Sequence, residues 1–197
     1  MTENFIEAQY DVTKKSKLKK FYEKNKIFIF SFMFILIFVF GSFSFYLENK
    51  EKKRVLLSEN YLQAKIYLEG GNKNKAIDIL KEVIFANDPT YSTLCLFLIM
   101  NQNLITDYRE LLALFDHLLE KNKFSKEERN LLIYKKALLN SNFVDESEML
   151  KSIKPLLNTE TFWKPHGLLL LGDYFVSKGE YIKAIEFYQK IFIINNL

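Results

Sequence analysis

A run of uncharged, strongly apolar residues near the N-terminus limits what this chain can fold into. Residues 27–47 contain no Asp, Glu, Lys or Arg, and eight of the 19 Phe of the chain lie within them. As an α-helix this run is about 31 Å long, close to the thickness of the hydrocarbon core of a bilayer. A lone strand would leave its backbone groups unpaired in lipid, which is costly. The sequence therefore predicts one transmembrane helix over residues 27–47.

A cleaved signal peptide is the alternative to a permanent anchor. Its apolar core has roughly 7–15 residues and ends at small residues before the cleavage site. Here the run is longer and ends in Phe45, Tyr46 and Leu47, and no Cys lies near its end. The sequence therefore favours an uncleaved signal anchor.

Basic residues on the two sides of the run predict its orientation. Seven Lys lie within residues 14–26, and four basic residues lie within residues 50–54. The side with more basic residues is the cytoplasmic one. We therefore expect a basic cytoplasmic tail over residues 1–26 and a domain over residues 48–197 on the far side of the membrane.

The charge of the large domain is nearly balanced. Residues 1–26 carry seven basic and four acidic side chains, a net charge of +3, whereas residues 48–197 carry 21 basic and 20 acidic side chains, a net charge of +1. Nucleic-acid binding needs a basic surface that such a domain lacks, so we expect no nucleic-acid partner. The basic tail suits the fixing of topology and contact with anionic headgroups.

Helical periodicity dominates the chain after the anchor, without strand-like alternation. Gly71, Asn103 and Gly179 are suited to end helices, and Pro89 and Pro165 fit the first turn of a helix. Eight helices in four pairs are predicted, over residues 55–69 with 74–86, 90–101 with 107–121, 126–140 with 146–157, and 162–177 with 181–194. Pro155 falls near the end of one of them, which predicts a short or kinked helix.

The first and last pairs repeat each other at a distance of 108 residues. Residues of the same kind coincide after this shift: Ala64 with Gly172, Tyr67 with Phe175, Gly71 with Gly179, Lys75 with Lys183, and Ala76 with Ala184. Three periods of 36 residues make up this distance, close to the roughly 34-residue repeat of a helix-turn-helix solenoid. Because one pair cannot bury its apolar face alone, we expect four stacked pairs with one continuous core.

The segment Leu171–Tyr188 carries the clearest version of this repeat. It contains Leu-Gly, an aromatic residue three positions later, Gly, then Lys-Ala and a final aromatic residue. This pattern resembles a tetratricopeptide repeat, of which the first pair is a weaker copy and the middle pairs are degenerate. The resemblance implies an all-α fold with one N-terminal transmembrane helix, followed by a tetratricopeptide-like solenoid of about four helical hairpins.

The order of parts along the chain narrows the resemblance. A short basic segment, Lys17–Lys24, runs directly into the membrane helix, and the segments Asp88–Tyr91 and Phe162–Pro165 open the second and fourth pairs. This layout is similar to the bacterial family of ancillary SecYEG translocon subunits with a tetratricopeptide-like domain. The resemblance implies a single-pass protein of the bacterial inner membrane, with its domain in the periplasm. Its implied partners are the SecYEG translocon and periplasmic chaperones or client proteins.

The end of the chain departs from the family pattern. The sequence stops at Leu197, where a terminal capping segment is usual. The last apolar face, Ile191–Ile194, therefore lacks an obvious cover. We expect self-association or a partner to cover it.

The sequence offers no motif for catalysis, cofactors or metals. Cys95 lies in an apolar run and is expected to be a small buried hydrophobe. His117 and His166 have no second ligand at i+3 or i+4, so structural or surface roles are expected. The acidic segment Asp145–Glu148 lies at a helix start, where capping explains it better than a metal loop. We predict no catalytic, cofactor-binding or metal-binding residue, no cofactor and no enzymatic activity.

Binding is the predicted function. The inner helices of stacked hairpins line a groove suited to peptides or partner helices. Exposed Tyr such as Tyr61 or Tyr174 are candidate contacts, and packing between repeats is the favoured alternative for them. Docking at the translocon would place this groove where secreted proteins emerge and meet chaperones. A scaffold for another envelope complex (cell-wall synthesis or division) is the first alternative, and a cytosol-facing organelle receptor is the second.

Overall fold

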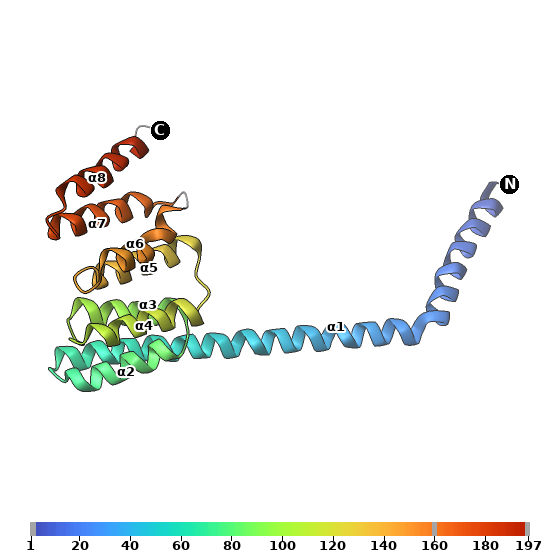
Figure 1. Ribbon diagram of the computed structural model, residues 1–197. Coiled ribbons are helices and arrows are strands. Elements are labelled where there is room, and N and C mark those ends of the chain that lie inside the picture. The colour runs from blue at the N-terminus through green and yellow to red at the C-terminus, as the bar shows by residue number, and fades with distance from the viewer. Residues whose placement is uncertain (1–2, 159–160, 196–197) are drawn as a thin grey trace. The chain divides into compact units, whose positions relative to one another are not determined.

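The computed structural model describes residues 3–158 and 161–195, and within them the protein is all-α with eight helices and no strand (Figure 1). This confirms the predicted fold class. The side chains of residues 1–18, 20, 23, 29, 194 and 195 lie outside the description, and they include those of four Lys of the predicted basic tail: Lys14, Lys15, Lys17 and Lys20. The chain divides into two compact units, Met1–Arg54 and Val55–Leu197.

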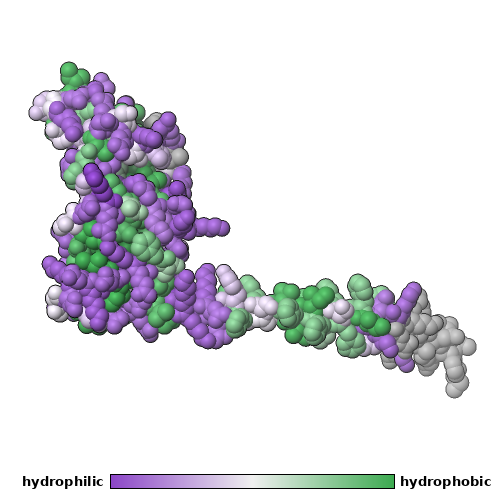
Figure 2. All heavy atoms as spheres, turned by 60° about the horizontal axis from the view of Figure 1, so that its bottom comes forward, coloured by the Kyte–Doolittle hydropathy of each residue, from purple (hydrophilic) through white to green (hydrophobic). Residues whose placement is uncertain are grey.

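Helix α1 spans Glu3–Glu69 and joins segments that the sequence analysis treated as separate. It contains no Pro, so no residue in it removes a backbone hydrogen bond. Within Lys24–Glu69 it has a stretch that is long and apolar enough to cross a membrane. Every described side chain of residues 27–47 is exposed, and Figure 2 shows hydrophobic side chains along this part of α1. An apolar surface of this length suits lipid rather than water.

The second unit consists of the end of α1 and seven further helices. Their bounds are α2 Lys73–Phe85, α3 Pro89–Asn101, α4 Tyr108–Lys121, α5 Lys126–Asn140, α6 Glu146–Leu157, α7 Lys164–Ser177 and α8 Tyr181–Asn195. The helix limits predicted after residue 55 agree with these to within two residues. The helices form four stacked hairpins (Figure 1), which we number 1 to 4: the end of α1 with α2, α3 with α4, α5 with α6, and α7 with α8.

Prolines lie where the sequence predicted them. Pro89 and Pro165 fall in the first turns of α3 and α7. Pro155 lies near the end of α6, which is a short helix of 12 residues. Here the missing N–H and the ring of proline disturb only the last turn.

Three of the four hairpins turn at a residue with left-handed backbone. The φ angles are 78° at Gly71, 47° at Asn103 and 78° at Gly179. In each turn the next residue donates its N–H to a carbonyl five positions earlier: Asn72 to Tyr67 at 2.8 Å, Leu104 to Ile99 at 3.0 Å, and Glu180 to Phe175 at 2.9 Å. This hydrogen bond is the one that closes a helix in the Schellman motif. Hairpin 3 turns instead through residues 141–145, where the described residues have no positive φ.

The 108-residue repeat extends to side-chain contacts. The Lys75 Nζ atom lies 4.5 Å from the centre of the Tyr67 ring, and Lys183 Nζ lies 5.1 Å from that of Phe175. The small residues at matched positions are buried in both copies: Ala64, Ala76, Gly172 and Ala184. Hairpins 1 and 4 are therefore two versions of one structural unit.

Two apolar clusters, rather than one continuous core, hold the hairpins together. Core 1 extends from Leu57 in α1 to Leu132 in α5. Core 2 extends from Ala137 in α5 to Ala184 in α8. The expectation of one continuous core was therefore wrong, and the two clusters meet at α5.

Polar residues on α5 explain this division. Lys136 lies between the two clusters along the helix and forms an ion pair with Asp116 of α4. Asn130 and Asn140 of α5 are buried, whereas Lys136 is partly exposed. Amide groups need polar partners when buried and a charged group stays near water, so these residues limit the apolar contact along α5.

An ion pair links each hairpin to the next. The pairs are Lys81 of α2 with Glu110 of α4 at 2.5 Å, Asp116 of α4 with Lys136 of α5, and Glu146 of α6 with Lys183 of α8 at 2.8 Å. All six side chains are partly exposed, so each pair adds little stability by itself. These ion pairs show which residues of each hairpin face the neighbouring hairpin.

Candidate protein-binding surfaces

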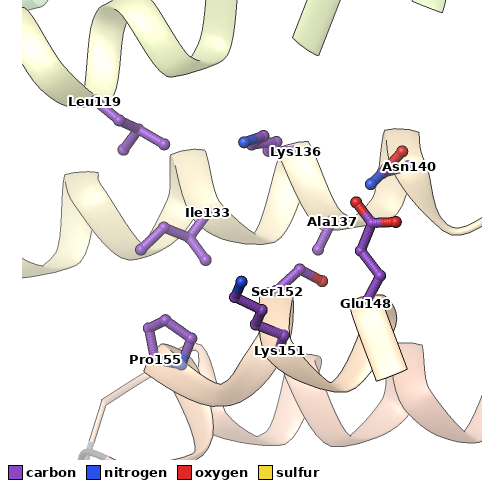
Figure 3. A pocket seen from close by; sticks show the side chains of 9 residues that line it. All are labelled: Leu119, Ile133, Lys136, Ala137, Asn140, Glu148, Lys151, Ser152 and Pro155. Carbon is purple, nitrogen blue, oxygen red and sulfur yellow. The ribbon is translucent and has the colours of Figure 1, made fainter. Parts of the chain in front are cut away.

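A cleft of about 330 Å³ lies between α4 and α6, over the surface of α5. Figure 3 shows Leu119 on one side, Ser152 and Pro155 on the other, and Ile133 and Ala137 of α5 between them. The remaining lining residues are polar or charged: Lys136, Asn140, Glu148 and Lys151. The cleft therefore has an apolar floor and a polar rim, as binding sites for peptide side chains commonly do.

Two lysines and one glutamate border this cleft. Lys136 is oriented by its ion pair with Asp116, and Lys151 is exposed. The backbone N–H of Glu148 donates to Asp145 Oδ1 at 2.9 Å, which fixes the first turn of α6 at the rim. Because Lys136 already pairs with Asp116, Lys151 and Glu148 are the charged groups that this cleft offers to a ligand with an apolar side chain on the floor.

A second hollow, of about 350 Å³, lies where α6, α7 and α8 meet. Its lining is mainly apolar, with two lysines: Leu157, Lys164, Leu168, Phe187, Lys190 and Ile193. The Lys190 Nζ atom lies 4.6 Å from the centre of the Phe187 ring, a favourable cation–π distance. The hollow thus combines the same two chemical features as the cleft between α4 and α6.

Four aromatic rings gather at the start of α7. Trp163 and His166 have ring centres 5.2 Å apart, Tyr134 of α5 lies 5.4 Å from Trp163, and Phe162 lies 5.0 Å from His166. Phe162 is 70% exposed, so the cluster reaches the surface. Burial, with a smaller contribution from the Asp173 carboxylate, raises the pKa of Tyr134, so its hydroxyl stays neutral and able to donate.

Sequence reasoning did not identify this cluster. The Phe162–Pro165 segment was noted only as the opening of the fourth pair. The available signal was its two adjacent aromatic residues before a helix, because exposed aromatic side chains are common contacts at protein interfaces.

Tyr174 does not line a groove. It is 4% exposed, and its hydroxyl donates to the Val144 carbonyl of hairpin 3 at 3.1 Å. Its candidate role as an exposed contact was therefore wrong, and the alternative of packing between repeats is correct. Tyr61 is half-buried against core 1.

The remaining candidates are a buried cysteine and two histidines with local partners. Cys95 is fully buried in α3, and burial raises the pKa of its thiol to about 12. His117 Nε2 lies 2.8 Å from Asn87 Oδ1, and His166 Nδ1 lies 3.2 Å from the Phe162 carbonyl oxygen. Within residues 3–158 and 161–195, no described group of three or more His, Cys, Asp or Glu could hold a metal ion.

Comparison with known proteins identifies the fold. No protein-family model matches the chain, and no curated protein matches its sequence. Among solved structures, the crystal structure of MamA is similar, with a TM-score of 0.50 and 15% sequence identity over 71% of this chain and 78% of the MamA chain. At this identity the similarity concerns the fold alone. The chain therefore has the fold of a tetratricopeptide-like helical-repeat protein, and its N-terminal helix is long and apolar enough to cross a membrane.

Proposed function

We propose that this protein is a membrane-anchored module that binds other proteins. The observation that carries the proposal is the cleft between α4 and α6, with its apolar floor of Ile133 and Ala137 beside the exposed Lys151. Its size and chemistry suit one or two side chains of a peptide. The apolar stretch of α1 would hold this cleft at a membrane surface.

The specific partner that we propose is the SecYEG translocon, with periplasmic chaperones or secreted proteins as transient ligands. This proposal is supported by the resemblance in layout: a basic segment, one apolar helix and four hairpins. The excess of Lys before residue 27 supports an inner-membrane protein with a cytoplasmic N-terminus and a periplasmic repeat domain. Confinement to the exit side of the channel would raise the effective concentration of the cleft near emerging chains.

Co-purification of the full-length protein from mild detergent, with partners identified by mass spectrometry, tests this proposal. We expect SecY, SecE and SecG among the partners. Recovery of a cell-wall or division complex without these subunits would instead favour the envelope-scaffold alternative. A topology reporter fused after Leu197 tests the orientation, because a cytoplasmic signal would contradict the periplasmic assignment.

A charge-reversal pair tests the cleft itself. Lys151→Glu changes the rim, whereas Lys154→Glu makes the same change of charge on the same helix at an exposed residue that does not line the cleft. We expect Lys151→Glu to lower the recovery of transient ligands several-fold and Lys154→Glu to leave it near the wild-type level. Equal effects of the two variants would show that the cleft is not the binding site.

A further inference from the structure

Among the described residues, helix α8 presents an exposed apolar face. On α8 the residues Ile182, Ile185, Gln189, Phe192 and Ile193 share one side of the helix, and we call this set the forward face. Phe192 is 69% exposed and Ile193 is 63% exposed. Of residues 191–194, which were expected to lack a cover, Phe192 and Ile193 are exposed, Ile191 is half-buried, and the side chain of Ile194 lies outside the described residues.

In hairpin 1 the next hairpin covers part of the matching face, whereas Asn74 and Phe85, which correspond to Ile182 and Ile193, stay exposed. Phe192 corresponds to Ile84 after the 108-residue shift, and Ile84 is fully buried in core 1. Ile185 corresponds to Ile77, which packs against the same core. The part of the forward face that contains Ile185 and Phe192 is therefore the surface on which one more hairpin would stack.

Hairpin 1 presents the surface that, in the other hairpins, packs against the preceding hairpin. On α1 the residues Val55, Leu62 and Ile66, together with Lys75 of α2, form what we call the rear face. All four are exposed, and Ile66 is 66% exposed. Ile66 and Leu62 correspond to Tyr174 and Leu170 of α7, which are nearly fully buried between hairpins 3 and 4. The rear face is therefore the surface that a preceding hairpin would cover.

One ion pair suggests a register for such a contact, because Lys81, the ninth residue of α2, pairs with Glu110, the third residue of α4. Asp116 and Lys183 occupy the same two positions in α4 and α8, but their partners are Lys136 of α5 and Glu146, the first residue of α6. In α8 and α2 the ninth and third positions hold Gln189 and Lys75. A Gln carbonyl can accept a hydrogen bond from a Lys ammonium group, so the two ends are compatible at this point.

From this equivalence we propose that the forward face of one copy of this chain stacks on the rear face of a second copy. The contact would continue the hairpin stacking that the chain forms three times within itself. It joins two different surfaces, so it is heterologous and leaves one free face at each end of a dimer. Copies anchored in one membrane would meet at a raised effective concentration. The inference is independent of translocon binding.

Crosslinking between differently tagged full-length chains tests the contact. One chain carries Lys75→Cys and the other carries Gln189→Cys, and both are treated in membranes with a short bis-maleimide. Both positions are exposed, and the native Cys95 is fully buried and so contributes little background. We expect the two chains to crosslink to each other and neither to crosslink to itself. Chains that carry both substitutions should give a ladder of oligomers.

Control variants test whether this crosslink reports a specific contact. Lys123→Cys, an exposed position outside both faces, should not crosslink with Gln189→Cys if the contact is specific. Phe192→Glu or Ile66→Glu should lower the mixed crosslink about tenfold or more, because each places a charge in an apolar contact. Phe162→Glu, at an equally exposed aromatic residue, should not lower it. Absence of the mixed crosslink, or efficient crosslinking of Gln189→Cys with itself, would overturn the proposal.

Discussion

The aromatic ring of Tyr188 in α8 lies directly against the Cα atom of Gly172 in α7. A Cβ atom at Gly172 would come within 2.1 Å of Tyr188 Cε1, far inside van der Waals contact. The Tyr188 hydroxyl donates to Asp173 Oδ1 at 2.7 Å, which holds the ring in place. Because the ring is fixed at one end and pressed against the backbone at the other, this contact sets how closely α7 and α8 approach.

Gly172→Ala is therefore expected to destabilise the repeat domain by about 1–3 kcal/mol, as overpacking of a core does. Gly167→Ala is the matched control on the same helix, since its nearest neighbour would be Ile153 Cγ2 at 3.4 Å. The control should be neutral or more stable by up to about 1 kcal/mol, because Ala favours helix. Urea unfolding of the full-length protein in mild detergent, followed by the fluorescence of Trp163, measures the free energy of unfolding of both variants. Equal stability of the two variants would contradict the close approach.

The left-handed turn of hairpin 4 gives a second prediction. Gly179 has a φ of 78°, so Gly179→Ala should cost about 1–2 kcal/mol. Gly179→Asn should cost less, because Asn103 already occupies the corresponding turn of hairpin 2 at a φ of 47°. Thermal unfolding followed by circular dichroism compares them. If Ala and Asn were equally costly, backbone strain would not be the cause.

The buried thiol of Cys95 gives a prediction about pH. Its pKa is near 9.0 in the unfolded chain and about 12 in the folded one. As pH rises from about 9 towards 12, the unfolded chain loses this proton and the folded chain keeps it, so folding stability falls. The stability advantage of the wild type over Cys95→Ala should therefore shrink across this range in unfolding experiments. In the folded protein at about pH 8, alkylation by iodoacetamide should be slow and should accelerate on unfolding.

The start of α5 gives a prediction in acid. The backbone N–H of Ser125 donates to Glu128 Oε2 at 2.9 Å, and the Ser125 hydroxyl donates to the same oxygen at 2.7 Å. These bonds lower the pKa of Glu128. A lowered pKa means that the carboxylate stabilises the fold near neutral pH and that this contribution is lost as pH falls through the folded-state pKa.

Ser125→Ala should accordingly cost about 1 kcal/mol near neutral pH, and less in acid. Ser141→Ala, at the other end of the same helix, is the control, because Ser141 donates only to the Leu138 carbonyl in the described structure. Urea unfolding at neutral pH and at about pH 3 measures both variants. A cost of Ser125→Ala that did not change with pH would show that Glu128 is not part of the cap.

Local signals made the helices of the repeat domain predictable. Gly71 and Gly179 end their helices through a backbone conformation that few other residues adopt, so the boundaries could be read directly. The continuity of α1 was not predicted, although no local turn signal interrupts it. Residues 48–54 are polar and were included in neither predicted helix, although Glu, Lys and Arg are good helix formers and no Pro separates them.

The binding surfaces could not be predicted in the same way. Leu119, Lys136 and Lys151 come from three helices and approach only because of how hairpins 2 and 3 stack. These hairpins carry the least regular repeats, so their register was not visible in the sequence. Tyr174 was misplaced for a related reason, because the Val144 carbonyl that receives its hydroxyl belongs to another hairpin.

The division of the core at α5 has a consequence for ligand binding. Leu119 packs against core 1 and Ile133 packs against core 2, and both line the cleft between α4 and α6. A ligand there would touch both clusters and favour the state in which they are aligned. Cleft occupancy and the alignment of the two halves would then be linked equilibria, each raising the other.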